Sequence, residues 1–187
     1  MNDYKVLRVI ISGDRSTGKT TLTSRLCKKE LEKDCNATIG VEFSSRYLPK
    51  LDLKVKIWDL GGDHRFENII VPYFKSGNIL VFVYSVDSYE SLGRVQYLYK
   101  RYKEEEVIKE HKIVVVCNKC DIIKDDNIGL VNQGSDWANS INADFISVSA
   151  KNNTNVDGLF NTLFFMSDIK IEEPKKDKVN FWRCSLF

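Results

Sequence analysis

The chain has 187 residues, of which 43% are hydrophobic and 29% are charged. This balance is typical of a globular domain and excludes a wholly disordered chain, a fibrous repeat and a small disulfide-stapled scaffold. The 28 basic and 26 acidic residues leave a net charge of only +2, whereas nucleic-acid-binding proteins usually carry a larger basic excess. We therefore expect one domain with its own core and no nucleic-acid partner.

The chain contains five cysteines, an odd number. Its first residues are polar and lack the apolar core of a signal peptide, so we expect a reducing, intracellular compartment. Cys117 and Cys120 form a C-x-x-C pair, but no second cysteine or histidine pair completes a zinc site. No apolar stretch approaches the roughly 20 residues that cross a bilayer, so we expect any membrane attachment to be at the surface or through a lipid.

Strands and helices are predicted to alternate along the chain. The predicted strands span residues 4–12, 43–48, 53–58, 79–86, 113–117 and 145–148. The predicted helices span residues 19–32, 88–110, 134–141 and 156–169. Continuous apolar runs such as ILVFVYSV are typical of strands buried on both faces. The alternation predicts an α/β fold, with a mostly parallel sheet and helices on both of its faces.

The sequence GDRSTGKT, which follows the first predicted strand, matches the phosphate-binding pattern G-x-x-x-x-G-K-[ST]. Its glycines let the backbone curl so that N–H groups face phosphate oxygens, while Lys19 neutralises the β/γ charge and Thr20 can bind Mg²⁺. A surface turn before a helix is the alternative, but the apolar strand before the motif favours nucleotide binding. The predicted phosphate-binding residues are Asp14, Arg15, Ser16, Thr17, Gly18, Lys19, Thr20 and Thr21.

Two short motifs, NKCD and SAK, each follow a predicted strand. They are expected at the carboxyl ends of parallel strands, where ligands bind. Asp121 can accept hydrogen bonds from N1–H and the exocyclic amine of guanine, and adenine does not offer that pair of donors. A backbone N–H of SAK can donate to guanine O6. The predicted base-binding residues are Asn118, Lys119, Asp121, Ser149, Ala150 and Lys151.

Taken in order, GDRSTGKT, TIGVEF, KIWDLGGDHRF, NKCD and SAK resemble the motifs of the Ras superfamily of small GTPases. Over roughly residues 4–170 the chain looks most like the Rab branch. The resemblance implies a P-loop GTPase domain over residues 1–170, with a six-stranded sheet that has one antiparallel strand. Residues 171–187 would form a short tail. It also implies GDP and GTP as ligands and Mg²⁺ as cofactor.

The resemblance assigns roles to residues that match the family motifs. Thr38 matches the switch I threonine, which binds Mg²⁺ and senses the γ-phosphate, and Asp59 matches the aspartate that holds Mg²⁺ through water. Thr20, Thr38 and Asp59 are thus the expected metal residues. Gly62 matches the glycine of switch II that contacts the γ-phosphate. The expected catalytic set is Arg15, Lys19, Thr38, Gly62 and Asp63.

The resemblance also implies protein partners, namely effectors, an exchange factor and an activating protein, for a chain expected to be a monomer. Phe43, Trp58 and Tyr73 match the aromatic triad that Rab effectors contact. Ordinary packing of these three side chains is the alternative. Ile39 and Gly40 complete the expected effector surface.

Two departures from the family pattern concern hydrolysis. Asp63 stands where the family has the glutamine that positions water, and Arg15 stands where it usually has a small residue. An anionic Asp63 near an anionic transition state predicts slow hydrolysis. Arg15 could instead form an ion pair with Asp63, or reach the γ-phosphate as an arginine finger in cis.

Further departures concern nucleotide retention and switch II. Leu31 replaces an aromatic residue that packs against guanine, and Cys35 replaces a tyrosine that covers the phosphates. Both changes predict weaker nucleotide binding and faster exchange. Leu60 and Gly61 replace a Thr-Ala pair, which predicts more backbone freedom in switch II.

The chain ends in Cys184-Ser-Leu-Phe, a C-a-a-X pattern that suggests prenylation of Cys184. A chance terminal cysteine is the alternative. One prenyl chain binds membranes reversibly, and the basic and aromatic residues before Cys184 could supply a second signal. We expect the cytoplasmic face of an intracellular or plasma membrane, with a cytosolic pool.

Three functions are compatible with these patterns. The first is a Rab-like GTPase, slow in hydrolysis, that recruits effectors on membranes in vesicle traffic. The second is a pseudo-GTPase scaffold held in one nucleotide state, which Asp63 and Arg15 favour. The third is another P-loop enzyme such as a nucleotide kinase, against which NKCD and SAK argue.

Overall fold

The computed structural model describes residues 4–31, 37–74, 77–108 and 111–167. These residues form a six-stranded sheet in the order β2-β3-β1-β4-β5-β6. Neighbouring strands are parallel except β2 and β3, which are antiparallel. The predicted sheet is therefore confirmed, with strands β1 (Lys5–Gly13), β2 (Val41–Leu48), β3 (Leu53–Leu60), β4 (Ile79–Ser85), β5 (Lys112–Asn118) and β6 (Asp144–Ser147).

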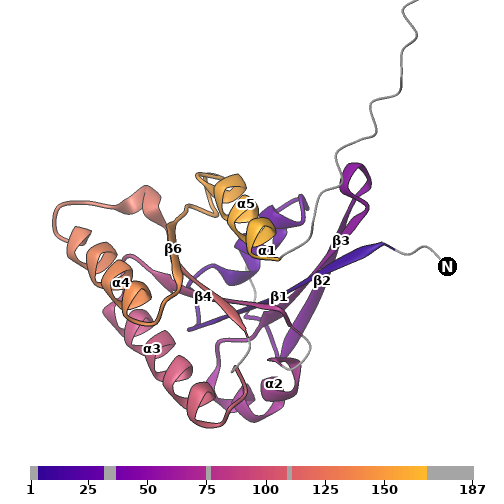
Figure 1. Cartoon of the computed structure of the whole chain (residues 1–187). Coiled ribbons are helices and arrows are strands. Elements are labelled where there is room, and N and C mark those ends of the chain that lie inside the picture. Colours follow the sequence, from indigo (N-terminus) through magenta and orange to yellow (C-terminus); the bar gives the residue numbers. More distant parts are fainter. Residues whose placement is uncertain (1–3, 32–36, 75–76, 109–110, 168–187) are drawn as a thin grey trace, which may run out of the picture.

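Helices cover both faces of this sheet (Figure 1). They are α1 (Lys19–Leu26), α2 (Glu67–Phe74), α3 (Tyr89–Glu104), α4 (Ile128–Ser140) and α5 (Val156–Met166). On one face, Val9 of β1 belongs to a core with Leu22 of α1 and Leu159 of α5. On the other, Ile10 of β1 belongs to a core that includes Val95 of α3 and Leu130 of α4. Successive residues of β1 thus serve opposite cores, as the strand period requires.

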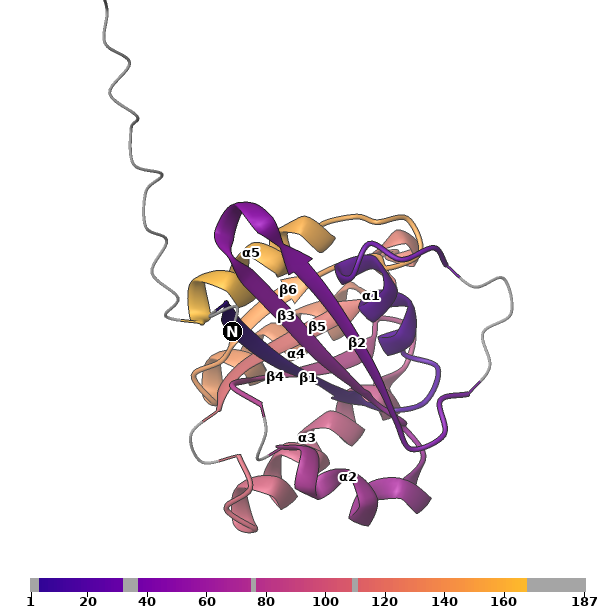
Figure 2. The same ribbon diagram turned by 90° about the vertical axis from the view of Figure 1, so that its right-hand side faces the viewer.

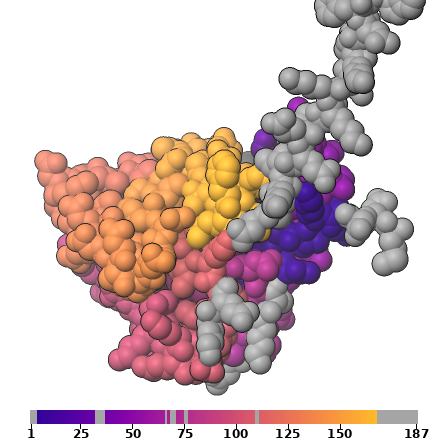
Figure 3. Space-filling model, viewed as in Figure 1, coloured from indigo at the N-terminus to yellow at the C-terminus, as the bar shows by residue number. Residues whose placement is uncertain are grey.

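Two helices dominate one side of the molecular surface. In the space-filling view, α4 in orange and α5 in yellow form the upper part of this side, and α3 lies below them (Figure 3). α3 packs on β4, in which every residue from Ile79 to Ser85 is buried and which contributes side chains to both cores. The continuous apolar run in the sequence therefore corresponds to a strand covered on both faces.

The antiparallel pair β2 and β3 forms a long hairpin at one edge of the sheet (Figure 2). A 3₁₀ turn, η1 (Pro49–Leu51), connects the strands, and Asp52 follows it in a left-handed conformation. The hydroxyl of Tyr47 donates to the Asp52 carboxylate at 2.6 Å, which closes the turn. At the other end of the hairpin the register places Val41 opposite Leu60. The segment that precedes β2 and the segment that follows β3 therefore lie next to each other.

The helices differ from the sequence prediction in extent. α1 ends at Leu26 rather than near residue 32, because Lys28 adopts a left-handed conformation that stops the helix. α3 ends at Glu104 rather than at residue 110. α4 begins at Ile128 rather than at residue 134, since its two glycines lower local helix propensity and obscure the pattern. α2 has no counterpart in the prediction, because a proline lies inside it.

Some predictions fall outside the described residues. These are the role of Cys35, the tail over residues 171–187 and the lipid site at Cys184. Across the part of the chain that the structure describes, no helix combines the length and apolar character needed to cross a membrane.

Candidate nucleotide-binding site

The phosphate loop lies between β1 and α1, at the carboxyl end of the central strand. The backbone carbonyl of Asp14 accepts hydrogen bonds from Lys19 Nζ at 2.5 Å and from Thr17 Oγ1 at 3.0 Å. Lys19 is only 6% exposed, and this burial lowers the pKa of its ammonium group. The negative charges of Asp59 and Asp14 raise that pKa in part. The loop thus holds a buried cation at the start of α1, where a phosphate would supply the missing counter-charge.

Three oxygen-bearing side chains meet beside this lysine. Thr20 Oγ1 donates to Asp59 Oδ2 at 2.5 Å, and the hydroxyls of Thr20 and Thr38 lie 2.9 Å apart. Asp59 is fully buried, and within the described ranges its Oδ1 has no hydrogen-bond partner. Burial raises the pKa of Asp59 to about 6, although Thr20 and Lys19 lower it. A buried carboxylate with a free oxygen beside two hydroxyls is a hard-oxygen donor set that fits Mg²⁺.

Carboxylate clusters do not offer an alternative metal site. Among the residues described, no group of three or more His, Cys, Asp or Glu side chains is arranged to hold a metal ion. A cation at Asp59 would therefore need other oxygens, such as those of Thr20, Thr38 and a bound phosphate.

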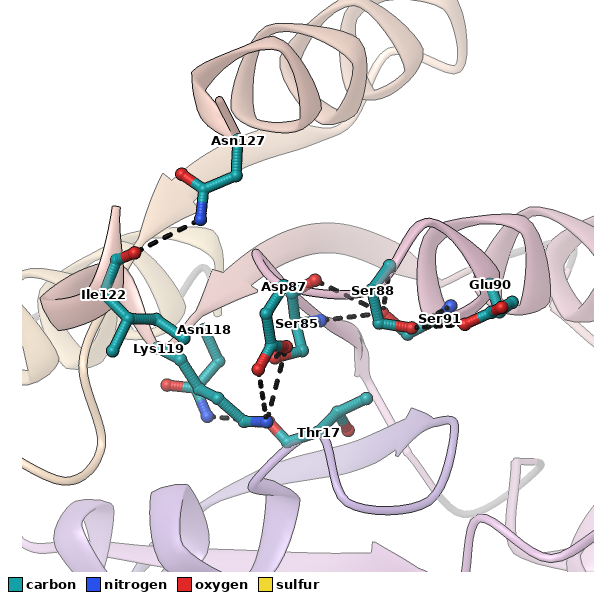
Figure 4. A network of polar contacts seen from close by, with 10 residues as sticks. All are labelled: Thr17, Ser85, Asp87, Ser88, Glu90, Ser91, Asn118, Lys119, Ile122 and Asn127. Atoms are coloured by element: carbon teal, nitrogen blue, oxygen red, sulfur yellow. Dashed lines mark hydrogen bonds and ion pairs between the residues drawn. The ribbon is translucent and has the colours of Figure 1, made fainter. Parts of the chain in front are cut away.

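Asn118, the first residue of NKCD, contacts both the phosphate loop and SAK, and Figure 4 shows its contact with Thr17 of the loop. Its Nδ2 donates to the carbonyl of Thr17 at 2.8 Å, and its Oδ1 accepts from the N–H of Ala150 at 3.0 Å. Ser149 Oγ donates to Asp121 Oδ1 at 2.5 Å. Hydrogen bonds therefore join the phosphate loop to NKCD, and NKCD to SAK, although the three motifs lie far apart in sequence.

Two contacts in this network were missed by sequence reasoning. The Nζ of Lys119 lies 3.4 Å from each carboxylate oxygen of Asp87 (Figure 4). Arg25 of α1 donates to the carbonyls of Ala150 at 3.0 Å and Lys151 at 2.7 Å. Neither contact follows from a motif, because each depends on which loops the fold brings together.

The segment after β3 passes directly over the phosphate loop. A Cβ added to Gly62 would lie 2.5 Å from the backbone nitrogen of Arg15, so only glycine permits this approach. The N–H of Gly61 donates to the carbonyl of Gly40 at 2.7 Å. The segments that resemble switch I and switch II are thus linked through their backbones, and both lie beside Thr20 and Asp59.

Asp63 has two cationic neighbours. Of the two alternatives for Arg15, the ion pair with Asp63 is present, with 3.9 Å between Nη1 and Oδ2. Arg65 is closer, with Nη2 2.7 Å from Oδ2 and Nε 3.1 Å from both oxygens. These hydrogen bonds hold the pKa of Asp63 far below its usual range. The sequence offered only a weak indication of the Asp63–Arg65 pair, namely two opposite charges two residues apart. The pair forms because the 3₁₀ turn η2 (His64–Phe66) brings the two side chains together.

The predicted effector residues lie on three different elements. Ile39, before β2, is 81% exposed, and Phe43 of β2 is 51% exposed. The Phe43 ring packs on Trp58 of β3, with centroids 5.4 Å apart. Tyr73 of α2 is half-buried against the core formed with α3. Phe43 and Ile39 are thus available to a partner, whereas Trp58 and Tyr73 also serve packing.

Comparisons with known proteins agree with this geometry. Residues 8–168 match the model of the Ras family. The chain is 30% identical to "Ras-related protein Rab-11B" of Dictyostelium discoideum over 165 residues, which are 87% of this chain and 73% of that protein. It is 31% identical to "Ras-related protein RABA4b" of Arabidopsis thaliana over 166 residues, covering 86% and 71% of the two chains. The chain therefore belongs to the Ras family of small GTPases and is Rab-like.

Proposed function

We propose that this chain binds GDP and GTP with Mg²⁺ and recruits effectors on membranes as a Rab-like switch in vesicle traffic. The observation that carries the proposal is the Asn118 network, which connects the phosphate loop to Asp121 and Ser149. An exchange factor and an activating protein are the expected regulators of a monomer. The cytoplasmic face of an intracellular or plasma membrane, with a cytosolic pool, is the proposed location.

In this proposal each part of the site has one task. Lys19 and the loop N–H groups bind the β- and γ-phosphates, and Asp121 accepts from guanine. Thr20, Thr38 and Asp59 would hold Mg²⁺, which when bound neutralises phosphate charge. Contacts of Thr38 and Gly62 with the γ-phosphate would be lost on hydrolysis, and this loss would release the surface around Ile39, Gly40, Phe43, Trp58 and Tyr73.

Hydrolysis is proposed to be slow. Glutamine can donate to the γ-phosphate while it accepts from the attacking water, but an ionised Asp63 cannot donate. Arg65 donates to both carboxylate oxygens of Asp63, so the orientation of this side chain is fixed by a neighbour on its own turn. Arg15 could offset the loss as an arginine finger in cis, because its side chain is 63% exposed.

The deciding experiment is single-turnover hydrolysis by GTP-loaded protein with Mg²⁺, followed by chromatography of the bound nucleotide. We expect slow conversion to GDP and a faster rate in Asp63→Gln. A wild-type rate equal to that of ordinary small GTPases, and unchanged by Asp63→Gln, would refute slow hydrolysis. An arginine finger would instead show as a further loss of rate in Arg15→Ala.

A pseudo-GTPase scaffold is the second candidate, and the pairing of Asp63 with both Arg15 and Arg65 favours it. A scaffold would retain one nucleotide through purification and exchange it neither spontaneously nor with EDTA. Free exchange of labelled GDP would exclude this candidate.

Membrane attachment through prenylated Cys184 completes the proposal. Mass spectrometry of the chain from eukaryotic cells would detect the lipid on Cys184. An unmodified Cys184, with cell fractionation unchanged in Cys184→Ser, would contradict lipid attachment but leave the nucleotide switch in place.

A further inference from the structure

A buried carboxylate links switch II (residues 61–74) to α3. Glu67, the first residue of α2, is only 8% exposed. Its Oε1 accepts from Nη2 of Arg94, and its Oε2 accepts from Nη1 of Arg101. Both arginines belong to α3, about two helical turns apart and so on one face. Each oxygen of Glu67 is therefore bound to a different guanidinium.

The two arginines depend on Glu67 to different degrees. Arg101 also donates to Glu105 on its own helix, at 2.8 Å. Within the described residues Arg94 forms no other ion pair, and its Nε is buried without a hydrogen-bond partner. Its guanidinium also lies 5.1 Å from the ring centroid of Tyr97, and the more distant charge of Asp14 in the phosphate loop stabilises it as well. If Glu67 moved away, Arg94 would stay buried and lose the carboxylate that pairs with it directly, which is strongly unfavourable.

Glu67 also lies close to the reacting end of switch II. Asp63 caps the turn η2 by accepting from the N–H of Arg65, and the N–H of Glu67 donates to the carbonyl of His64 at the other end of that turn. The imidazole Nδ1 of His64 lies 3.3 Å from Glu67 Oε1. One short turn therefore separates the buried carboxylate from Gly62, which rests on the phosphate loop.

The other side of this contact is rigidly held. α3 buries Leu92, Val95 and Leu98 against the sheet, and Ser88 caps its first turn. The position of Glu67 is thus set by a helix that belongs to the core.

We infer that Glu67, acting through Arg94, is a positioning residue that holds switch II on α3 whichever nucleotide is bound. This inference rests on the proposed function. Because switch II is already ordered, GTP binding costs less conformational entropy than it would with a mobile switch II. This lower cost raises the affinity for GTP relative to GDP. Glu67 is turned toward α3 at the far end of η2 from Asp63, so it is not a catalytic residue.

Amide hydrogen exchange of residues 62–74 tests the contact directly. The full chain is compared with GDP and with a non-hydrolysable GTP analogue, both with Mg²⁺. We expect similar protection in the two wild-type states, and exchange about tenfold faster in the GDP form of Glu67→Gln. Glu105→Gln is the matched control, because it removes a carboxylate from Arg101 without touching α2, and it should exchange like wild type.

Affinities for GDP and the GTP analogue separate positioning from a general loss of structure. Glu67→Gln should weaken binding of the analogue about tenfold and leave GDP binding unchanged, whereas a structural defect would weaken both. If Glu67→Gln does not fold, Arg101→Gln replaces it, since Arg101 is the more exposed partner, and a smaller shift in the same direction is expected.

Two results would overturn the inference. One is a tenfold difference in wild-type exchange between the nucleotide states, and the other is an unchanged ratio of the two affinities in the variant. Failure of both nucleotides to bind wild type would instead overturn the proposed function. The contact would then be judged by exchange of residues 62–74 in nucleotide-free wild type and Glu67→Gln.

Discussion

Arg65 is the closest cationic partner of Asp63, with 2.7 Å between Nη2 and Oδ2, whereas Arg15 lies 3.9 Å from the same oxygen. The residue in the place of the family's glutamine is therefore engaged by a neighbour on its own turn. The carboxylate of Asp63 forms an ion pair with Arg15 of the phosphate loop. Its orientation, however, is fixed by hydrogen bonds from Arg65 within η2.

Arg65→Ala is expected to raise the pKa of Asp63 toward the usual value near 4, because the hydrogen bonds from Arg65 are the largest cause of its depression. A depressed carboxyl pKa stabilises the fold above the unfolded pKa, and this contribution is lost as pH falls through the folded pKa. NMR titration of the Asp63 carboxyl checks this: the variant should titrate near pH 4 and wild type well below it. Equal midpoints would contradict the assignment, and Arg8→Ala, at an exposed position of β1, serves as control.

Asn118→Ala is expected to destabilise the fold by about 1–3 kcal/mol, because it leaves Thr17 and Ala150 without their buried partners. It should also speed GDP release, since the phosphate loop and SAK are no longer linked. Denaturant unfolding and the off-rate of labelled GDP measure the two effects. Asn152→Ala is the matched control, because Asn152 is exposed and donates to Ser149 through its backbone N–H, which the substitution keeps. Equal off-rates in the two variants would argue against a linking role.

Removal of Mg²⁺ with EDTA is expected to accelerate GDP release at least roughly tenfold in wild type, because the cation neutralises phosphate charge. In Asp59→Ala the release should already be fast and insensitive to EDTA, since the free Oδ1 that fits the cation is gone. Stopped-flow release of fluorescent GDP measures both. An EDTA response as large in the variant as in wild type would place the cation elsewhere.

Gly61→Ala is expected to cost about 1–3 kcal/mol of stability, the usual range for overpacking. The added Cβ would lie 2.7 Å from the Thr38 carbonyl oxygen and 3.0 Å from that of Gly40, so switch I would have to move. Gly93→Ala in α3 is the control: its Cβ meets nothing within 4 Å, and it should stabilise by roughly 0.5–1 kcal/mol. Thermal unfolding of the two variants in opposite directions is the expected result.

Much of the fold was predictable because its signals are local. The apolar run over β4 and the motif after β1 each report on a few consecutive residues, and the structure has them as predicted. Helix ends were less predictable. α1 ends after Leu26 because the backbone of Lys28 is left-handed. α4 begins early because Leu130 is buried against the sheet. The spacing of apolar residues in the sequence reports neither property.

Within the site, the predicted Thr20, Thr38 and Asp59 do meet, as do Asn118 and the phosphate loop. The resemblance made these pairings predictable, because motif order specifies which strand ends carry them. The partners of Asp63 and Lys119 were not predictable in this way, since Asp87 belongs to no motif and the resemblance assigns no role to Arg65 within KIWDLGGDHRF.

By itself, the sequence determined that this chain contains a Rab-like α/β fold with a phosphate loop, two base motifs and an aspartate in the place of the glutamine. These properties depend on residue identity and short spacing, which folding does not change. Only the tertiary structure decided that Arg65 takes Asp63 and that Glu67 is buried between two arginines of α3. Which charged side chains pair with each other depends on their separation and on their burial. Both are fixed only when α2 and α3 pack on the same face of the sheet.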